Sequence, residues 1–316
     1  MAADFTHYSE IRKLEFYVLG SEENYVDSAA DVTNKELFKG ELPVVGGVYD
    51  AAFGSTSLSY LCSTCLRPKG SCSGHSGAVT MRYPVKNPLF RESILKWLKI
   101  ICFKCGLPLV DKNIEVASSR LLIEYVKLAK TIDKCPHCDE PHPTVIKDKY
   151  EQSKFIVEYK SGKYARREEL FNNQIKQILE KISDETVLKL HKPLMSHPRN
   201  FIINIVRVPP NTIRPDIRKI GGSRSNNNDI TALTKKIVEL NDALPIKIPE
   251  VNEISKELRE LYFTLDMTYF EMIKGSSSAN NQVRMTTATN KAPSSIASRL
   301  PKKTGKQFCL QQVTAL

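Results

Sequence analysis

The chain has 316 residues, of which 46 are Lys or Arg and 35 are Asp or Glu, so its formal net charge is +11. This length predicts about two domains, and a hydrophobic content of 41% excludes collagen-like, simply disordered and small disulfide-scaffold proteins. Because neither a run of about 18 apolar residues nor a signal-peptide pattern occurs, the sequence predicts a soluble intracellular protein. In a reducing compartment its eight cysteines are expected to bind metal, to act in catalysis or to be buried as thiols.

The charge is distributed unevenly along the chain. Residues 1–61 contain ten acidic and four basic side chains, a net charge of −6, so the remaining residues carry a net charge of +17. An excess of this size predicts a polyanionic partner, with nucleic acid the first candidate and an acidic membrane surface the second. A basic surface that only keeps the protein soluble is the alternative.

In chain order, the first predicted elements are short strands at residues 10–18 and 44–49, broken by glycines. Apolar spacing predicts helices within residues 91–105, 114–130 and 170–182, and Ser183 offers an N-cap for a further turn. Residues 201–208 are rich in β-branched side chains and predict a strand that ends before Pro209 and Pro210.

The clearest periodicity lies between residues 229 and 273. Apolar residues recur at spacings of three and four in two runs, and prolines between the runs force a break. The runs are Ile230, Leu233, Ile237, Leu240 and Leu244, then Ile254, Leu258, Leu261 and Leu265. They predict two helices folded back as an antiparallel hairpin. Such a hairpin either projects as a docking surface or packs into a globular core, and the periodicity is compatible with both.

Four pairs of soft ligands, each pair spaced three positions apart, carry the most specific signal. The pairs are Cys62 and Cys65, Cys72 and His75, Cys102 and Cys105, and Cys135 and Cys138. Because a tetrahedral Zn²⁺ takes four such ligands, the sequence predicts two zinc sites, structural because the protein fills every coordination position. The simplest pairing joins the first pair with the second and the third with the fourth. An interleaved pairing, which the spacing also allows, would give the cross-braced topology of ubiquitin-ligase modules.

The sequence contains no catalytic residue that we can assign. It has no nucleotide-binding glycine motif, no His-Glu-x-x-His helix and no cluster of closely spaced aspartates. Cys309 lies outside the four ligand pairs and is expected to be a free thiol. These features predict a zinc-stabilised basic protein with a helical hairpin, as one part of a larger nucleic-acid machine.

Further short motifs stand in a fixed order around the ligand pairs. Gly47, Asp50 and Gly54 precede the first pair, Cys-Ser-Gly-His-Ser-Gly at residues 72–77 is followed by Tyr-Pro-Val, and Pro-Pro-Asn-Thr-Ile-Arg-Pro occupies residues 209–215. A Ser-Arg-Leu motif at residues 298–300 is followed by basic residues. This order resembles the N-terminal, clamp-forming part of the largest subunit of multisubunit DNA-directed RNA polymerases. The short loops and divergent N-terminus are more similar to a large DNA virus enzyme, of the asfarvirus-like kind, than to a cellular one.

The resemblance implies an α+β fold, a zinc-stabilised clamp region with a projecting antiparallel helical hairpin. It implies six segments: an N-terminal strand segment (1–61), a two-zinc clamp core (62–142), helices, strand and lid (143–228), a clamp coiled-coil hairpin (229–273), a rudder-like basic segment (274–306) and an unmatched tail (307–316). It also implies that basic residues near the lid and rudder grip DNA and the RNA–DNA hybrid. These residues are Arg207, Arg214, Arg218, Lys219, Arg224, Arg299, Lys302, Lys303 and Lys306.

Partners and location follow from the same resemblance. The expected partners are the second-largest and other polymerase subunits, the DNA template with its RNA–DNA hybrid, and a transcription factor on the hairpin; no membrane is expected. The expected location is the virion or a viral factory in the host cytoplasm if the protein is viral, and the nucleus otherwise. The alternative function is a freestanding zinc-binding adaptor, such as a cross-braced ubiquitin ligase.

The match to the family stops at Gln307, before the aspartates that hold the catalytic Mg²⁺ in the family. We therefore expect this chain to be a truncated or split form of a longer subunit and to be inactive alone. The expected cofactors are two structural Zn²⁺ ions, with Mg²⁺ only in the downstream catalytic part.

Overall fold

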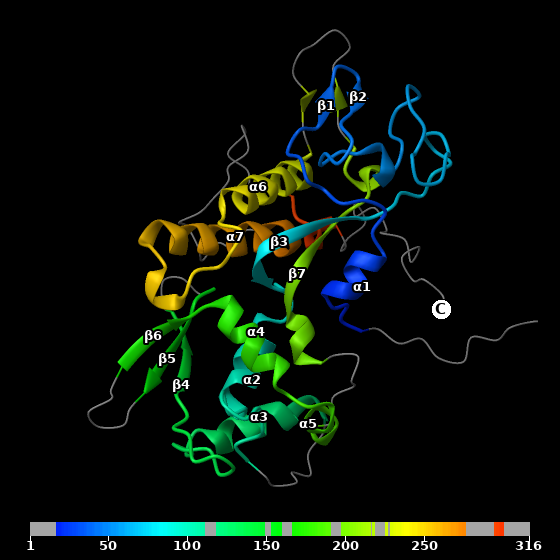
Figure 1. Cartoon of the computed structure of the whole chain (residues 1–316). Helices are drawn as coiled ribbons and strands as arrows, with labels where there is room; N and C mark the ends of the chain where they lie inside the picture. Colours follow the sequence, from blue (N-terminus) through cyan, green and yellow to red (C-terminus); the bar gives the residue numbers. More distant parts are fainter. Residues whose placement is uncertain are drawn as a thin grey trace, which may run out of the picture.

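The computed structural model describes residues 17–110, 118–148, 153–159, 166–190, 197–215, 217–218, 225–226, 228–275 and 294–299 (Figure 1). The α-helices are α1 (Ser21–Val26), α2 (Arg91–Ile100), α3 (Ser118–Ala129), α4 (Asn172–Glu180), α5 (Asp184–Lys189), α6 (Asp229–Ala243) and α7 (Lys256–Lys274). The strands are β1 (Phe38–Lys39), β2 (Leu42–Pro43), β3 (Gly77–Lys86), β4 (Thr144–Lys147), β5 (Phe155–Tyr159), β6 (Arg166–Leu170), β7 (Ile202–Val208), β8 (Ile217–Arg218) and β9 (Ser225–Asn226). Short 3-10 helices include η1 (Ala51–Phe53), η4 (Pro198–Phe201), η5 (Asn211–Ile213) and η7 (Ala297–Arg299). Helices beside small separate sheets confirm the α+β class.

The longest sheet is the antiparallel pair β3 and β7, which lies at the centre of the molecule (Figure 1). Its register runs regularly from Gly77 opposite Val208 to Thr80 opposite Ile205, and then shifts so that Val85 faces Ile203. At this irregularity the side chain of Asn241 bonds both the Arg82 N–H (2.8 Å) and the Thr80 carbonyl (3.0 Å). The amide of Asn241 therefore satisfies backbone groups that the shift removes from the ladder.

Two hydrophobic cores divide the described residues. In the orientation of Figure 1, the lower core is formed by α2, α3, α4, β4 and β5 around Trp97, and it includes Cys102 and Cys135. The upper core lies between the β3–β7 sheet and the helices α6 and α7, and it also buries Phe53. Each core supplies the buried apolar surface that holds its elements together.

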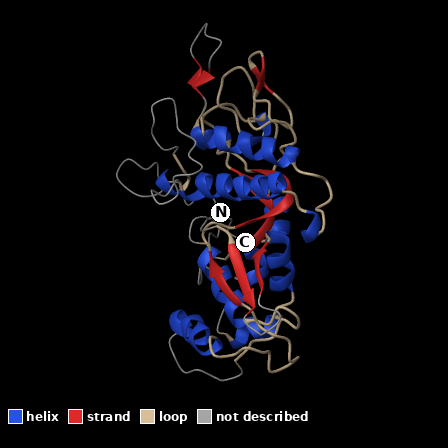
Figure 2. Cartoon of the chain, turned by 90° about the vertical axis from the view of Figure 1, so that its left-hand side faces the viewer, coloured by secondary structure: helices blue, strands red, loops and turns tan. Residues whose placement is uncertain are grey.

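The helices α6 and α7 lie side by side in both views (Figures 1 and 2). They run in opposite directions, because Thr234 near the start of α6 contacts Met272 near the end of α7, with 3.5 Å between Oγ1 and Sδ. The heptad residues Ile230, Leu233 and Ile237 are buried against β3 and α7. Both helices thus pack onto the body, whereas the connection between them is exposed at Ile246, of which 85% is accessible.

Within the described part of the chain, the predicted elements differ from the structure in two places, and the strand predicted at residues 10–18 lies mostly outside the described residues. The strand predicted at residues 44–49 is wrong: these residues form turns, since Gly46 has a φ of +69° and its N–H bonds the Asp50 carboxylate. The helix predicted within residues 91–105 ends at Ile100 as α2, because Cys102 begins a tight turn. The strand β7 and the Ser183 N-cap, whose hydroxyl accepts from the Thr186 N–H at 3.2 Å, are confirmed. No helix of the described residues is long and apolar enough to cross a membrane.

Candidate metal centres

Three of the four ligand pairs adopt the same backbone turn. These turns begin at Cys62, Cys102 and Cys135. In each turn, the N–H of the first cysteine donates to the carbonyl of the residue five positions later. The carbonyl of the same cysteine accepts a hydrogen bond from the N–H of the residue four positions later. The residue at the latter position has a positive φ in each turn, 57° for Leu66, 73° for Gly106 and 54° for Asp139. Each turn is therefore built locally and holds two thiols close together.

The fourth pair differs because its second ligand is a histidine. The Gly74 N–H lies 3.3 Å from the Cys72 sulfur, and Gly74 has a φ of +95°, a conformation that glycine adopts without strain. The next residue, His75, bonds through its N–H to the carbonyl of Phe53 at 3.3 Å. This arrangement turns the His75 ring toward the cysteines immediately before β3 begins.

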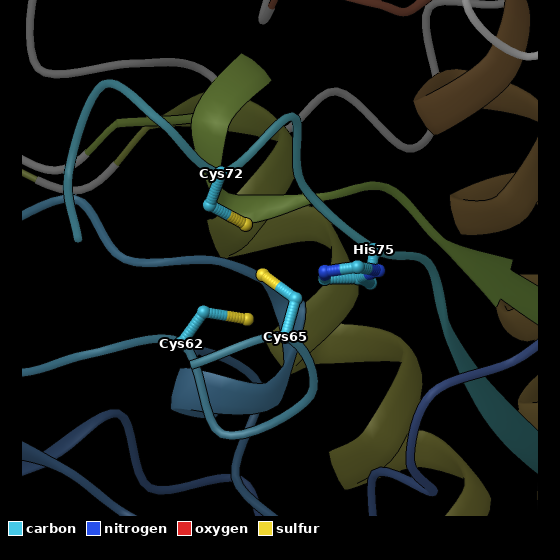
Figure 3. Close-up of side chains that lie close together, drawn as sticks. All are labelled: Cys62, Cys65, Cys72 and His75. Carbon is cyan, nitrogen blue, oxygen red and sulfur yellow. The ribbon is translucent and has the colours of Figure 1, made fainter. Parts of the chain in front are cut away.

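The structure groups the eight predicted ligands into two sets. In each set, the candidate ligand atoms all lie within 4.8 Å of one another. Site one contains Cys62, Cys65, Cys72 and His75, and Figure 3 shows their side chains converging on one space. Site two contains Cys102, Cys105, Cys135 and Cys138. The pairs thus combine as neighbours in the chain, which is the simplest of the predicted pairings, and not as a cross-brace.

The donor atoms fit a tetrahedral metal ion. In site two the Cys102 and Cys138 sulfurs are 3.5 Å apart and the Cys105 and Cys135 sulfurs are 3.7 Å apart. Four sulfurs about 2.3 Å from a central Zn²⁺ would be separated by about 3.8 Å. In site one, the Nε2 atom of His75 is buried and has no hydrogen-bond partner among the residues described. A metal ligand role would satisfy this atom.

Burial keeps one thiol of each site, Cys72 and Cys102, from ionising readily. It raises the pKa of Cys72 to about 11 and that of Cys102 to about 12, so neither thiol ionises unaided at neutral pH. A bound dication would stabilise the thiolates, and its binding would release protons. Because the protein offers four donors at each site, no position is left for a reactive water, and the arrangement is suited to structural cross-linking.

A family model described as RNA polymerase Rpb1, domain 1, matches residues 8–307, which include both ligand sets and both helices of the α6–α7 pair. The chain belongs to this family. It is 33% identical over 313 residues to the DNA-directed RNA polymerase RPB1 homolog of African swine fever virus, covering 95% of this chain and 21% of that protein. It is 28% identical over 281 residues to the DNA-directed RNA polymerase subunit Rpo1N of Methanothermobacter thermautotrophicus, covering 83% of this chain and 31% of that protein.

A similarity to a third relative covers nearly all of the chain. The DNA-directed RNA polymerase III subunit RPC1 of Plasmodium falciparum is 26% identical over 330 residues, covering 97% of this chain and 14% of that protein. The chain therefore spans about a fifth of the length of its viral relative and less than a third of the archaeal one. These matches confirm the resemblance to the N-terminal part of the largest polymerase subunit.

The predicted nucleic-acid contacts of this Rpb1-family chain are described only in part. Arg207 in β7 is partly exposed, and its guanidinium forms an ion pair with Asp27. Arg218 lies in β8 and Arg299 ends η7, but their side chains are outside the described residues. Five further predicted contacts lie outside the described residues altogether. They are Lys219, Arg224, Lys302, Lys303 and Lys306.

Arg214 does not occupy the predicted surface position. Its side chain is fully buried, and its guanidinium donates to the Pro209 carbonyl (2.7 Å), the Val48 carbonyl (2.6 Å) and the Thr231 hydroxyl (3.3 Å). No carboxylate of the described residues forms an ion pair with it, and burial lowers the pKa of Arg214 to about 10. The donors of Arg214 are therefore committed to the protein interior, and its contact with nucleic acid stays a prediction.

We expect Arg214→Met to destabilise the fold by about 3 kcal/mol, since hydrogen bonds from a charged donor contribute roughly 1.5–3 kcal/mol each and their acceptors would remain buried. Urea unfolding monitored by circular dichroism measures this change. The matched control is Arg207→Met, which removes a partly exposed arginine and should cost about 1 kcal/mol or less. Equal losses in the two variants would contradict a structural role for Arg214.

A neighbouring residue that sequence reasoning missed is Asn211, which is fully buried. Its side-chain N–H₂ group donates to the carbonyls of Asp50 (2.7 Å), Gly54 (3.2 Å) and Tyr49 (3.2 Å). It thereby joins the segment that precedes site one to the segment that follows β7. In the sequence, Asn211 is marked only by its position directly after Pro209 and Pro210. The Pro-Pro-x-x-x-Arg-Pro pattern allows any residue type at this position, so it does not point to an asparagine.

Proposed function

We propose that the chain acts within a DNA-directed RNA polymerase, where it helps to hold DNA and the RNA–DNA hybrid. The observation that carries this proposal is the family match across residues 8–307. The viral, archaeal and protozoan relatives all bear names of DNA-directed RNA polymerase subunits. Nucleotidyl transfer would belong to the assembled polymerase, with Mg²⁺ held outside this chain, and the viral relatives favour a virion or viral factory as its location.

Zn²⁺ is the proposed metal of both sites. Sets of three cysteines with one histidine, and of four cysteines, are the donor sets that structural zinc prefers. Site one would fix the loop before β3, and site two would join the ends of α2 and α3 at the lower core. The grouping of ligands along the chain supports this reading over the cross-braced adaptor, which would require Cys62 and Cys65 to share an ion with Cys102 and Cys105.

The six predicted segments give the proposed division of labour. Residues 1–61 and 62–142 would build the clamp base, residues 143–228 would carry the lid, and residues 274–306 the rudder. The α6–α7 pair would dock a transcription factor through its exposed connection, where Ile246 and Lys247 are accessible and Ile248 and Pro249 are half-buried. Arg207, Arg218, Lys219, Arg224, Arg299, Lys302, Lys303 and Lys306 would contact phosphates, which requires charge but no base recognition.

The proposal is tested by co-expressing the chain with the second-largest polymerase subunit encoded by the same genome. We expect the two proteins to co-purify and the complex to bind an RNA–DNA hybrid with an affinity that falls as salt rises. Replacing Arg299, Lys302 and Lys303 by alanine should weaken binding and reduce the slope of log K against log salt by about 1 for each lost phosphate contact. Fluorescence anisotropy at several salt concentrations provides the measurement.

The matched control removes three exposed lysines that are not among the predicted nucleic-acid contacts. These are Lys35, Lys127 and Lys256. This triple alanine variant has the same net charge as the test variant, so a purely global charge effect would change both slopes equally. Equal slopes, or failure to co-purify with the second-largest subunit, would overturn the proposed role.

A further inference from the structure

The two ligand turns of site one are both bonded to the short helix η1. Each of the three carbonyls of η1 accepts a hydrogen bond from one of these turns. The donors are the Ser63 N–H to Ala51 (3.3 Å), the Thr64 hydroxyl to Ala52 (2.8 Å) and the His75 N–H to Phe53 (3.3 Å). A metal ion bound at site one would cross-link the two turns, because each turn supplies two of its ligands. The same ion would therefore hold η1 in place.

The segment that follows β7, residues 209–215, packs against the same elements. The Thr212 hydroxyl donates to the Ser73 carbonyl at 3.2 Å, inside the second ligand turn. A Cβ atom added at Gly74 would clash with the Thr212 hydroxyl, so the backbone of this turn touches the segment directly. The side chain of Asn211 bonds the two carbonyls that flank η1. Residues 209–215 are thus fixed both to η1 and to a ligand turn of site one.

Residues 209–215 also form the base of the hairpin made by β8 and β9. The two strands pair in antiparallel register at the upper end of the molecule (Figure 1). Arg214 precedes β8, and its buried guanidinium bonds the hydroxyl of Thr231 in the first turn of α6, the helix that follows β9. The Arg214 side chain therefore joins the chain before the hairpin to the chain after it. Where residues 209–215 lie decides where the hairpin begins and ends.

We infer that the metal ion of site one positions the β8–β9 hairpin, with Asn211, Thr212 and Arg214 as the positioning residues. The chain of contacts runs from the ligand turns through η1 and residues 209–215 to the hairpin. Because Arg218 of β8 is a predicted nucleic-acid contact, loss of zinc from site one weakens nucleic-acid binding although every basic residue is still present. This consequence for binding rests on the proposed function. Site two belongs to the lower core and has no part in the chain of contacts.

The first test measures hydrogen exchange in the complete chain without any partner. His75→Ala removes one ligand of site one and should reduce the bound zinc from two ions to one. We expect the amides of residues 211–214 and of β8 and β9 to exchange at least tenfold faster in this variant. His75→Cys keeps four soft ligands and should restore both the zinc content and the slow exchange. The matched control Cys138→Ser removes a ligand of site two and should change exchange at the same amides less than twofold.

The second test breaks the chain of contacts while the metal stays bound. Asn211→Ala removes the bonds to the carbonyls that flank η1, and Thr212→Val removes the bond to Ser73. Both variants should retain two zinc ions, and both should exchange faster in β8 and β9. The combined variant His75→Ala/Asn211→Ala should exchange no faster than the more affected single variant, because both changes interrupt the same chain of contacts. Effects that multiply in the combined variant would show two independent losses of stability and would overturn the inference.

The third test uses the complex with the second-largest polymerase subunit and a fluorescein-labelled RNA–DNA hybrid. His75→Ala should weaken hybrid binding at least tenfold, and His75→Cys should bind as the wild type does. Equal binding by His75→Ala and the wild type would overturn the consequence for nucleic acid. Unchanged exchange in β8 and β9, or an equal rise in α3 of the lower core, would overturn the positioning role itself. A wild-type complex that binds no hybrid would contradict only the proposed function, because the exchange experiments contain no nucleic acid.

Discussion

Replacing Cys102 and Cys135 by serine is expected to reduce the bound zinc from two ions to one and to unfold the lower core. Both side chains are buried within that core, and they come from the ends of α2 and of the segment that follows α3. The apparent free energy of binding structural zinc is about 10–16 kcal/mol. The free energy of unfolding of a typical domain is about 5–15 kcal/mol, so the loss of one zinc ion is enough to unfold it. Metal analysis by inductively coupled plasma mass spectrometry and thermal unfolding of the purified variant measure both effects.

The matched control is Cys309→Ser, because Cys309 belongs to neither ligand set and lies outside the described residues. This substitution makes the same chemical change and should leave the zinc content at two and the melting temperature unaltered.

Loss of zinc from site one should disturb the upper end of β3 but not the lower core, since its ligands lie next to β3. A Cys102→Ser/Cys135→Ser variant that retains two zinc ions would contradict the assignment.

Asp266→Asn is expected to destabilise the protein by about 3–5 kcal/mol. The Asp266 carboxylate is buried in α7 and accepts from the Lys86 ammonium group at 3.2 Å and the Arg91 guanidinium at 3.1 Å. It also accepts the backbone N–H of Lys86 at 3.0 Å, and Asn172 of α4 bonds the same lysine. Removing one partner of a buried ion pair leaves an uncompensated charge in the interior, and this buried charge causes most of the expected loss of stability.

The Asp266 cluster joins elements of both cores. Lys86 ends β3, Arg91 begins α2, Asn172 begins α4 and Asp266 lies in α7, so the upper helix pair is tied to the lower core at one point. We therefore expect Asp266→Asn to loosen the contact between the cores, with faster hydrogen exchange in α7 and in the first turn of α2. The control is Asp242→Asn, an exposed aspartate that pairs with Arg82 at 3.3 Å, which should cost less than about 1 kcal/mol.

The stability that Asp266 contributes depends on pH in a definite direction. Burial alone would raise the pKa of Asp266, but the charges of Lys86 and Arg91 lower it below the ordinary value. A carboxylate with a lowered pKa stabilises the fold fully above the unfolded-state pKa of about 4, and this contribution is lost as the pH falls through the folded-state pKa. The difference between wild type and Asp266→Asn should therefore be constant near neutral pH and should shrink in acid. A difference that grows in acid would contradict the ion-pair explanation.

Much of the fold was predictable where the signal is local. The helix α6, the strand β7 and the cap at Ser183 follow from apolar spacing, β-branched residues and a hydroxyl at the right position, all within a few residues of one another. The strand β3 was not predicted, because its Gly77–Lys86 sequence becomes a strand by pairing with β7, which is distant in the chain. The β-branched residues at 44–49 favour a strand, but the turn formed by Gly46 and Asp50 prevails in the structure.

The candidate site shows the same division. The spacing of the cysteines determined that three similar cysteine turns would form, because those turns are closed by hydrogen bonds no more than five residues apart. The Cys72–His75 turn also depends on a distant partner, since the His75 N–H bonds the Phe53 carbonyl. Only the tertiary structure decided which turns share a site, since site two joins Cys102 to Cys138 across the whole of α3. Likewise, the family resemblance placed Arg214 among the cations expected to contact nucleic acid, but folding buries its side chain, which bonds Val48 and Thr231. A sequence determines by itself what neighbouring residues can build, whereas burial and long-range pairing exist only once separate segments have packed together.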